Sequence, residues 1–268
     1  MIKTSNGWNL FTKNYILGKA KASVLIIHGL AEHCERYAHV AKALNEIGCN
    51  VYTFDLRGHG QSTGTAALAL STDEYREDVE NVYHTIPKNL PIYILGHSMG
   101  GMIALKFLVF RERKDIKGAI FSGAALEVGE DITPITKKMV KILGKIAPSF
   151  KTVKLNPESI SRDPETVEAY KNDPLIYHGG AKAGLGLALL DTIKELKDQF
   201  HLLDKPVLIM HGGDDKITNI KGSEALYNTC KSEDKTLKIW EGAYHEIFNE
   251  TNKNDVISFM TTWVSHRI

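Results

Sequence analysis

The chain has 268 residues, with 33 Lys and Arg against 32 Asp and Glu, a formal net charge of +1, and 43% hydrophobic residues. This length is enough to bury a large core, and the composition is that of an ordinary globular protein. The simplest expectation is therefore a single domain over residues 1–268. The balanced charge argues against nucleic acid as a partner.

Cysteine usage and hydropathy indicate where the protein works. Cys34, Cys49 and Cys230 are an odd, widely spaced set without a CxxC pair, which is typical of a reducing compartment and gives no zinc site. The N-terminal stretch lacks the apolar core and cleavage site of a signal peptide, and the chain has no run of about 18 apolar residues. The expected location is the cytoplasm, with peripheral contact to membranes left open.

Short apolar runs alternate along the chain with longer segments of helical periodicity. In chain order we predict strand 24–27, helix 37–47, strand 50–54, helix 72–86, strand 92–95, helix 99–113, strand 119–121, strand 207–210, helix 221–230, strand 236–240 and helix 254–266. Most strand runs are apolar throughout, as in parallel strands covered on both faces. The alternation predicts a mostly parallel central sheet with helices on both faces, and ligands in such a sheet bind beyond the carboxyl ends of the strands.

The alternation stops at residues 125–182, where strand signals vanish and five prolines crowd together. A stretch of this length between two strand–helix units is typical of an inserted helical cap. Within it, residues 135–146 show a clear helical pattern. Its apolar side chains share one face, and its lysines gather on another. The apolar residues are Ile135, Met139, Ile142, Leu143 and Ile146; the lysines are Lys137, Lys138, Lys141 and Lys145.

Two interpretations of helix 135–146 have similar weight. It covers the core with its apolar face and leaves the lysines in solvent. Alternatively, it is a basic amphipathic helix that lies on a lipid surface.

Ser98 lies between glycines in GHSMGG (96–101), where a predicted strand meets a predicted helix. This is the context of a nucleophile elbow, a turn so tight that side chains at Gly96 and Gly100 would collide with neighbouring backbone. The helix N-terminus there favours a developing negative charge. A phosphate-binding loop would need GxGxxG or GxxxxGK[ST], and neither is present. Ser98 is therefore the candidate nucleophile.

A serine nucleophile needs a base and an acid, which follow it in the order acid, then histidine, in elbow folds. The predicted strand 207–210 leads into HGGDDK, and the strand ending at residue 240 leads into EGAYHE. We predict Asp215 as the acid and His245 as the base, with Asp214 as the alternative acid. The oxyanion hole needs the N–H of the residue after the nucleophile, Met99, and one from an early loop, for which Leu30 is the candidate.

These segments resemble the monoacylglycerol lipases of the α/β-hydrolase superfamily. The matching stretches are HGLAEHCERY (28–37), FDLRGHGQS (54–62), GHSMGG (96–101), YKNDPL (170–175), HGGDDKI (211–217) and DKTLKIWEGAYHEIFNE (234–250). The resemblance implies the α/β-hydrolase fold with its cap, the same nucleophile, acid, base and oxyanion donors, and no metal or organic cofactor.

The resemblance also implies a lipid ester substrate. Glu32, Arg36 and Tyr170 would line a polar recess for the glycerol hydroxyls, although Glu32 and Arg36 would serve equally well as a pair that holds the oxyanion loop. The expected reaction is cleavage of monoacylglycerol to fatty acid and glycerol. Lysophospholipid hydrolysis or general carboxylesterase activity with the same three residues is the alternative, and a non-catalytic ligand-binding member of the fold is a third.

Overall fold

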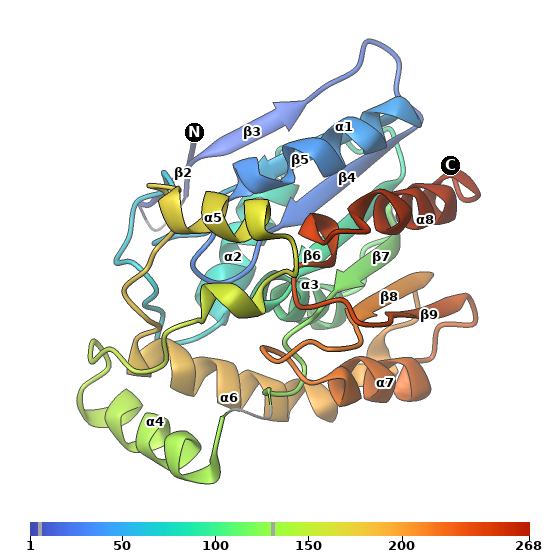
Figure 1. Ribbon diagram of the computed structural model, residues 1–268. Coiled ribbons are helices and arrows are strands. Elements are labelled where there is room, and N and C mark those ends of the chain that lie inside the picture. The colour runs from blue at the N-terminus through green and yellow to red at the C-terminus, as the bar shows by residue number, and fades with distance from the viewer. Residues whose placement is uncertain (5–6, 130–131) are drawn as a thin grey trace.

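Within the residues that the computed structural model describes (1–4, 7–129 and 132–268), seven strands form one sheet in the order β3-β5-β4-β6-β7-β8-β9 (Figure 1). Their bounds are β3 Thr12–Tyr15, β4 Ala22–Ile27, β5 Cys49–Phe54, β6 Ile92–His97, β7 Ile116–Ser122, β8 Val207–Gly212 and β9 Lys235–Trp240. Strands β4 to β9 pair in parallel. The predicted mostly parallel sheet, and the six strands that build it, are confirmed.

Three short strands near the N-terminus were not predicted. β3 pairs antiparallel with β5 at the edge of the sheet, and its sequence, TKNY, has half-buried and exposed positions only. β1 (Ile2–Lys3) and β2 (Asn9–Leu10) form a separate two-stranded sheet. Strands with so few buried side chains lack the apolar run or alternation that marks a strand in sequence.

Helices cover both faces of the sheet, as predicted. α1 (Ala38–Glu46) and α8 (Lys253–Ser265) pack on one face, against side chains such as Val24 and Ile26 of β4. α2 (Asp73–Tyr83), α3 (Met99–Phe110) and α7 (Ile220–Thr229) pack on the other face, against Leu25 and Ile27. Successive residues of a strand point to opposite faces, so an all-apolar strand such as β4 contributes to both cores.

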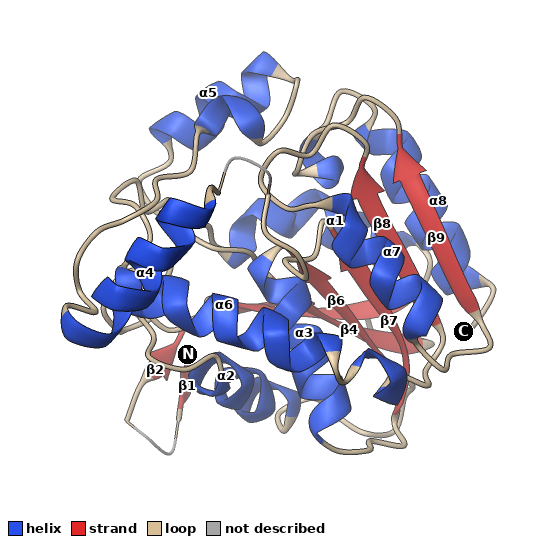
Figure 2. Cartoon of the chain, turned by 90° about the horizontal axis from the view of Figure 1, so that it is seen from below, coloured by secondary structure: helices blue, strands red, loops and turns tan. Residues whose placement is uncertain are grey.

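Three further helices lie between β7 and β8: α4 (Pro134–Ile146), α5 (Pro164–Asn172) and α6 (Ala183–Lys197). Figure 2 shows α4 lying outside α6, and α6 next to α3. α4 begins where the Thr133 side chain accepts the Thr136 N–H and Pro134 takes the first helical position. The predicted cap limits of 125–182 stay a prediction, and residues 130–131 within them lie outside the described residues.

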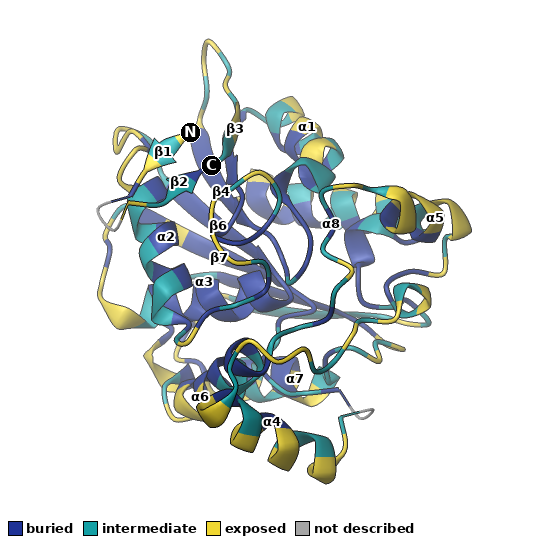
Figure 3. Ribbon diagram, turned by 90° about the vertical axis from the view of Figure 1, so that its left-hand side faces the viewer, coloured by how far each residue is buried: buried dark blue, intermediate teal, exposed yellow. Residues whose placement is uncertain are grey.

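The apolar face of α4 points to solvent. Ile135, Met139, Ile142 and Ile146 are between 45% and 81% exposed (Figure 3). The helix instead buries Val140 and Gly144, and a side chain at Gly144 would meet Leu187 of α6. The interpretation that the apolar face covers the core is therefore wrong, because the contact with α6 uses the small residues of the helix.

None of the helices in the described ranges combines the length and the apolar character that crossing a bilayer requires.

Candidate active site

Ser98 lies on a strained turn between β6 and α3. Its backbone φ angle is 54°, in a region that residues other than glycine rarely adopt. A Cβ at Gly96 would lie 2.5 Å from the Gly100 carbonyl oxygen, and a Cβ at Gly100 would lie 2.2 Å from that of Ile27. The prediction that both glycines are needed for backbone clearance is confirmed. The turn brings the Ser98 side chain to the carboxyl edge of the sheet.

The structure brings Ser98, His245 and Asp215 together. His245 Nε2 lies 2.8 Å from Ser98 Oγ, and His245 Nδ1 lies 2.7 Å from Asp215 Oδ2. The side chains of His245 and Asp215 are 5% and 1% exposed, whereas Asp214 is exposed. Because a carboxylate only accepts hydrogen bonds, Nδ1 carries the proton and Nε2 is free to accept from the serine hydroxyl. The geometry thus favours Asp215 over Asp214 as the acid.

The charges of this group stabilise one another. Burial alone would raise the pKa of Asp215, but the His245 charge and the hydrogen bonds from His211 and His245 hold that pKa far below its usual range. Burial alone would lower the pKa of His245, but the charge and hydrogen bond of Asp215 raise it above its ordinary value. A histidine oriented and stabilised by Asp215 in this way can accept a proton and hold it as an imidazolium.

Leu30 and Met99 lie near Ser98. Met99 is the first residue of α3, where backbone N–H groups have no acceptor within the helix. Leu30 lies in the loop after β4, next to Ala31, whose φ of 67° marks a second strained position. The side chains of Leu30 and Met99 line the same cavity as Ser98. Their role as oxyanion donors stays a prediction that this arrangement favours.

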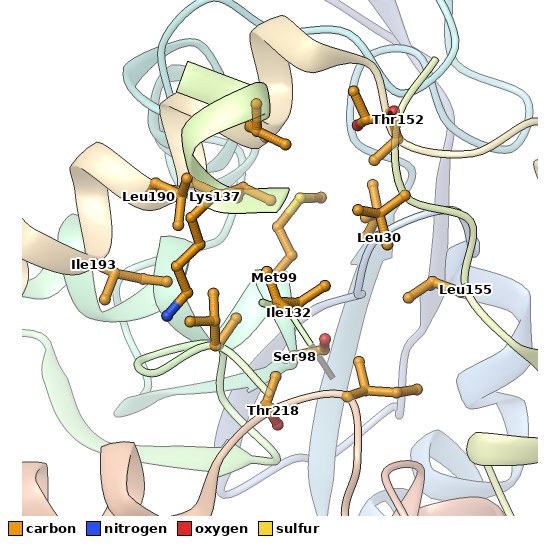
Figure 4. Close-up of a pocket in the computed structure, with 18 of the residues that line it drawn as sticks. Leu30, Ser98, Met99, Ile132, Lys137, Thr152, Leu155, Leu190, Ile193 and Thr218 are labelled. Carbon is orange, nitrogen blue, oxygen red and sulfur yellow. Dashed lines mark hydrogen bonds between the residues drawn. The ribbon is translucent and has the colours of Figure 1, made fainter. Parts of the chain in front are cut away.

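An apolar cavity of about 150 Å³ opens at Ser98 (Figure 4). Its walls come from the oxyanion loop, the elbow, α4, the loop after α4, and α6, and include Leu30, Met99, Val140, Leu155, Leu190 and Ile193. The stem of Lys137 runs along one side. A cavity whose wall surface is mostly apolar favours a hydrocarbon chain as its occupant.

Sequence and structure comparisons agree on the kind of protein. The family model described as serine aminopeptidase S33 matches residues 18–252. A monoacylglycerol lipase of Mycolicibacterium smegmatis is 36% identical over 91% of this chain and 88% of its own length. The crystal structure of Paleococcus ferrophilus monoacylglycerol lipase superposes with a TM-score of 0.88 at 29% identity, covering 96% of this chain and 99% of the other.

The chain belongs to the monoacylglycerol lipase family of α/β-hydrolases. It is a carboxylic ester hydrolase. The family resemblance seen in the sequence is therefore confirmed. The relatives are not uniform in name, since a protein of Bacillus subtilis called phospholipase YtpA is also 32% identical, over 88% of this chain and 92% of its own length.

The three residues that the family resemblance implied for the polar recess lie together, with Glu32 and Tyr170 next to the guanidinium of Arg36. Arg36 Nη1 donates to Glu32 Oε2 over 2.8 Å, and its Nη1 and Nη2 donate to both carboxylate oxygens of Glu246 over 2.7 and 2.6 Å. The Tyr170 ring lies with its centroid 5.0 Å from the Arg36 guanidinium carbon. Most donors of Arg36 are thus already occupied by protein carboxylates.

Glu32 connects this pair to the oxyanion loop. Its Oε1 accepts the Gly29 N–H over 2.6 Å and the Tyr37 hydroxyl over 2.8 Å. Burial alone would raise the pKa of Glu32, but the Arg36 charge outweighs it and lowers the pKa to about 2. These contacts favour the interpretation in which Glu32 and Arg36 hold the oxyanion loop. Direct contact of either residue with glycerol stays a prediction.

Two residues beside the predicted site, Glu246 and His211, were missed by sequence reasoning, and a third, His97, was expected to point away from the site as a packing residue. Glu246 holds Arg36, His97 packs its ring with a centroid 4.8 Å from that of His245, and His211 contacts Asp215. Each is a neighbour of a predicted residue in the sequence or lies at the carboxyl end of a strand, and that was the available signal. Across the described parts of the chain, no group of three or more His, Cys, Asp or Glu is arranged to hold a metal ion.

Proposed function

We propose that the protein hydrolyses monoacylglycerol to fatty acid and glycerol through an acyl-enzyme on Ser98. The observation that carries the proposal is the hydrogen-bonded chain from Ser98 Oγ through His245 to Asp215, with distances of 2.8 and 2.7 Å, at the mouth of an apolar cavity. Membership of the monoacylglycerol lipase family supports the choice of substrate.

The reaction follows from the positions of these groups. Ser98 Oγ attacks the ester carbonyl while His245 Nε2 takes the hydroxyl proton. The N–H groups of Leu30 and Met99 donate to the oxyanion that forms, which is usually the largest electrostatic contribution to such a reaction. The protonated His245 then gives its proton to the departing glycerol oxygen. Water, activated by the same nitrogen, attacks the acyl-enzyme and releases the fatty acid.

The two ends of the substrate meet different surroundings. The acyl chain occupies the aliphatic cavity between the elbow and the cap helices. The glycerol side is bounded by Tyr170 and by the pair Glu32 and Arg36, which acts mainly by holding the oxyanion loop because both side chains are already hydrogen-bonded to protein groups. The buried carboxylates carry a bound guanidinium, which argues against recognition of a free amino terminus as in an aminopeptidase.

A comparison of substrates with one shared acyl chain tests the proposal. We expect kcat/KM on monoacylglycerol to exceed that on the diacylglycerol, lysophosphatidylcholine and p-nitrophenyl ester by at least about tenfold, because buried polar groups discriminate against a poorly matching headgroup. Initial rates from released fatty acid measure this. Faster cleavage of lysophosphatidylcholine would make the protein a lysophospholipase, and a preference for short p-nitrophenyl esters would make it a general carboxylesterase.

We further propose that α4 docks on a lipid surface from the cytoplasmic side. Its exposed apolar side chains, Ile135, Met139, Ile142 and Ile146, form the α4 patch, and exposed lysines at 138, 141 and 145 accompany them. Such a helix lies in the interface with its apolar face among acyl chains and its lysines near anionic headgroups. The inner face of α4 lines the cavity through Val140 and Lys137. A lipid leaving the bilayer therefore has a short path to Ser98.

Serine substitutions in the α4 patch test this docking. Ile135→Ser with Ile146→Ser should weaken sedimentation with phosphatidylcholine–phosphatidylglycerol vesicles by about tenfold or more, because two isoleucines lose burial in lipid. Hydrolysis of soluble p-nitrophenyl butyrate should stay within about twofold of the parent.

Ile16→Ser is the matched control, since Ile16 is 56% exposed but lies in the loop after β3. It should leave vesicle binding unchanged. Equal binding by the parent and the α4 variant would contradict docking through this helix.

A further inference from the structure

His211 is the last residue but one of strand β8 and lies against the acid of the proposed triad. It is fully buried, and its Nε2 lies 3.2 Å from Asp215 Oδ2, the oxygen that His245 also contacts. Its other ring nitrogen, Nδ1, lies 2.8 Å from the hydroxyl of Ser223 on α7, which is also fully buried. The imidazole of His211 in β8 and that of His245 in the loop after β9 therefore approach one carboxylate oxygen.

The surroundings of His211 define its tautomer. Nε2 faces the Asp215 carboxylate and, over 3.3 Å, the Thr218 carbonyl oxygen. Both are acceptors only, and the Thr218 hydroxyl, 3.4 Å from Nε2, donates to Asp215 Oδ2 instead, so Nε2 must carry the proton. With the proton on Nε2, the other nitrogen, Nδ1, accepts from the Ser223 hydroxyl. Ser223 thus holds the His211 ring with its N–H on the side of the Thr218 carbonyl oxygen and of Asp215 Oδ2.

We propose that His211 is a positioning residue for the hydrolysis: its Nε2–H donates to Asp215 Oδ2 and orients the carboxylate toward His245. The proposal rests on the triad proposed above. The carboxylate also accepts from the Ile217 and Thr218 N–H groups at Oδ1 and from the Thr218 hydroxyl at Oδ2. The donors on Oδ1 anchor one end of the carboxylate, and His211 fixes the direction of the other.

His211 also moderates the acid. A carboxylate that shares its charge among several donors attracts the His245 imidazolium less strongly than a carboxylate with fewer donors. Removing the His211 donor should therefore raise the proton affinity of His245. The other titratable groups that act on this pair come from β6, the oxyanion loop and the loop after β9; they are His97, Glu32 and Glu246, and Arg36 binds both of these carboxylates. These stay in place when His211 is replaced.

Two substitutions of His211 separate positioning from packing. His211→Leu removes the donor, and kcat should fall about five- to tenfold, the factor expected for one lost hydrogen bond. The acid limb of the kcat/KM profile should move to higher pH. His211→Gln restores an amide N–H toward Asp215 and should recover most of the lost kcat, with the acid limb returning toward the parent position. Ile209→Val is the matched control, because this fully buried residue lies two positions earlier on the same face of β8.

The control should lower Tm without moving the acid limb. The proposal is overturned if His211→Leu changes only Tm, as Ile209→Val does, or if His211→Gln behaves like His211→Leu.

Should the leucine variant fail to fold, Ser223→Ala gives the same test with the ring retained but its tautomer no longer held. The profiles are measured on p-nitrophenyl butyrate, so an error in the natural substrate does not affect them. ¹⁵N NMR of the parent reports the His211 tautomer even without turnover, and a proton on Nδ1 rather than Nε2 would overturn the proposal by itself.

Discussion

Replacing Ser98 by alanine should lower kcat for ester hydrolysis by about 10⁶-fold, because a triad without its nucleophile retains only the catalysis of binding and the oxyanion hole. The fold should persist. Alanine keeps the Cβ that the strained φ of 54° already accommodates, and the change removes one hydroxyl, whose hydrogen bond is to His245. Turnover, labelling by a fluorophosphonate and thermal unfolding of the same preparation measure the three expectations.

The labelling experiment distinguishes a hydrolase from a ligand-binding member of the fold. A protein that only binds ligand should not be captured covalently, whereas an activated serine should react stoichiometrically. Ser161→Ala serves as the control, because Ser161 is a buried cap serine that donates to the Asn249 carbonyl oxygen and lies outside the hydrogen-bonded chain of Ser98. Labelling should survive in the control. Persistent labelling of Ser98→Ala would identify another residue as the nucleophile.

The central sheet was predictable because its strands are buried on both faces. A strand such as β4, with six buried residues, leaves an apolar run that no loop would carry. β3 left no such trace, since an edge strand pairs through its backbone and needs few buried side chains. Helix α5 escaped prediction because prolines and the interrupted pattern of the cap obscured its periodicity. Helix α6 lies beyond the predicted cap, and its first turn contains two glycines, which weaken a helical pattern.

The direction of the α4 apolar face could not be deduced from periodicity. A helical pattern identifies which side chains share a face, but the partner of that face depends on distant segments. Here Val140 and Gly144 contact α6, and the small size of Gly144 permits close approach to Leu187. The larger isoleucines consequently remain outside. A pattern of small residues on one side of the helix was the available signal for this packing.

The reactive residues were predictable in order but their supporting contacts were not. Elbow chemistry requires a serine, an acid and a histidine after successive strand ends, which the motif and spacing supply. The hydrogen-bonded ion pair between Arg36 and Glu246 joins residues 210 positions apart, and no local sequence pattern predicts it. Such contacts follow from tertiary packing at the carboxyl edge, where the oxyanion loop and the histidine loop meet.

Substitution by asparagine should have very different effects on kcat at the two neighbouring aspartates, Asp214 and Asp215. Asp215→Asn should lower kcat by about 10⁴-fold, because an amide can present its NH₂ to His245 Nδ1 and so favour the wrong tautomer. Asp214→Asn should change kcat by no more than about twofold, since Asp214 is exposed and its backbone N–H donates to the Ala243 carbonyl oxygen in either variant. Single-turnover rates on one ester measure both effects.

The pH profile adds a test with a definite sign. Asp215 raises the pKa of His245, so activity in the parent is lost as the pH falls through that raised value and the base becomes protonated. Without the carboxylate, the pKa of His245 should fall, and the residual activity of Asp215→Asn should persist to lower pH than in the parent. Asp214→Asn should leave the acid limb where it is. A larger loss at Asp214, or a limb that moves with Asp214 and not with Asp215, would contradict the assignment, because Asp215 is the carboxylate hydrogen-bonded to the imidazole and the strongest of the groups that raise its pKa.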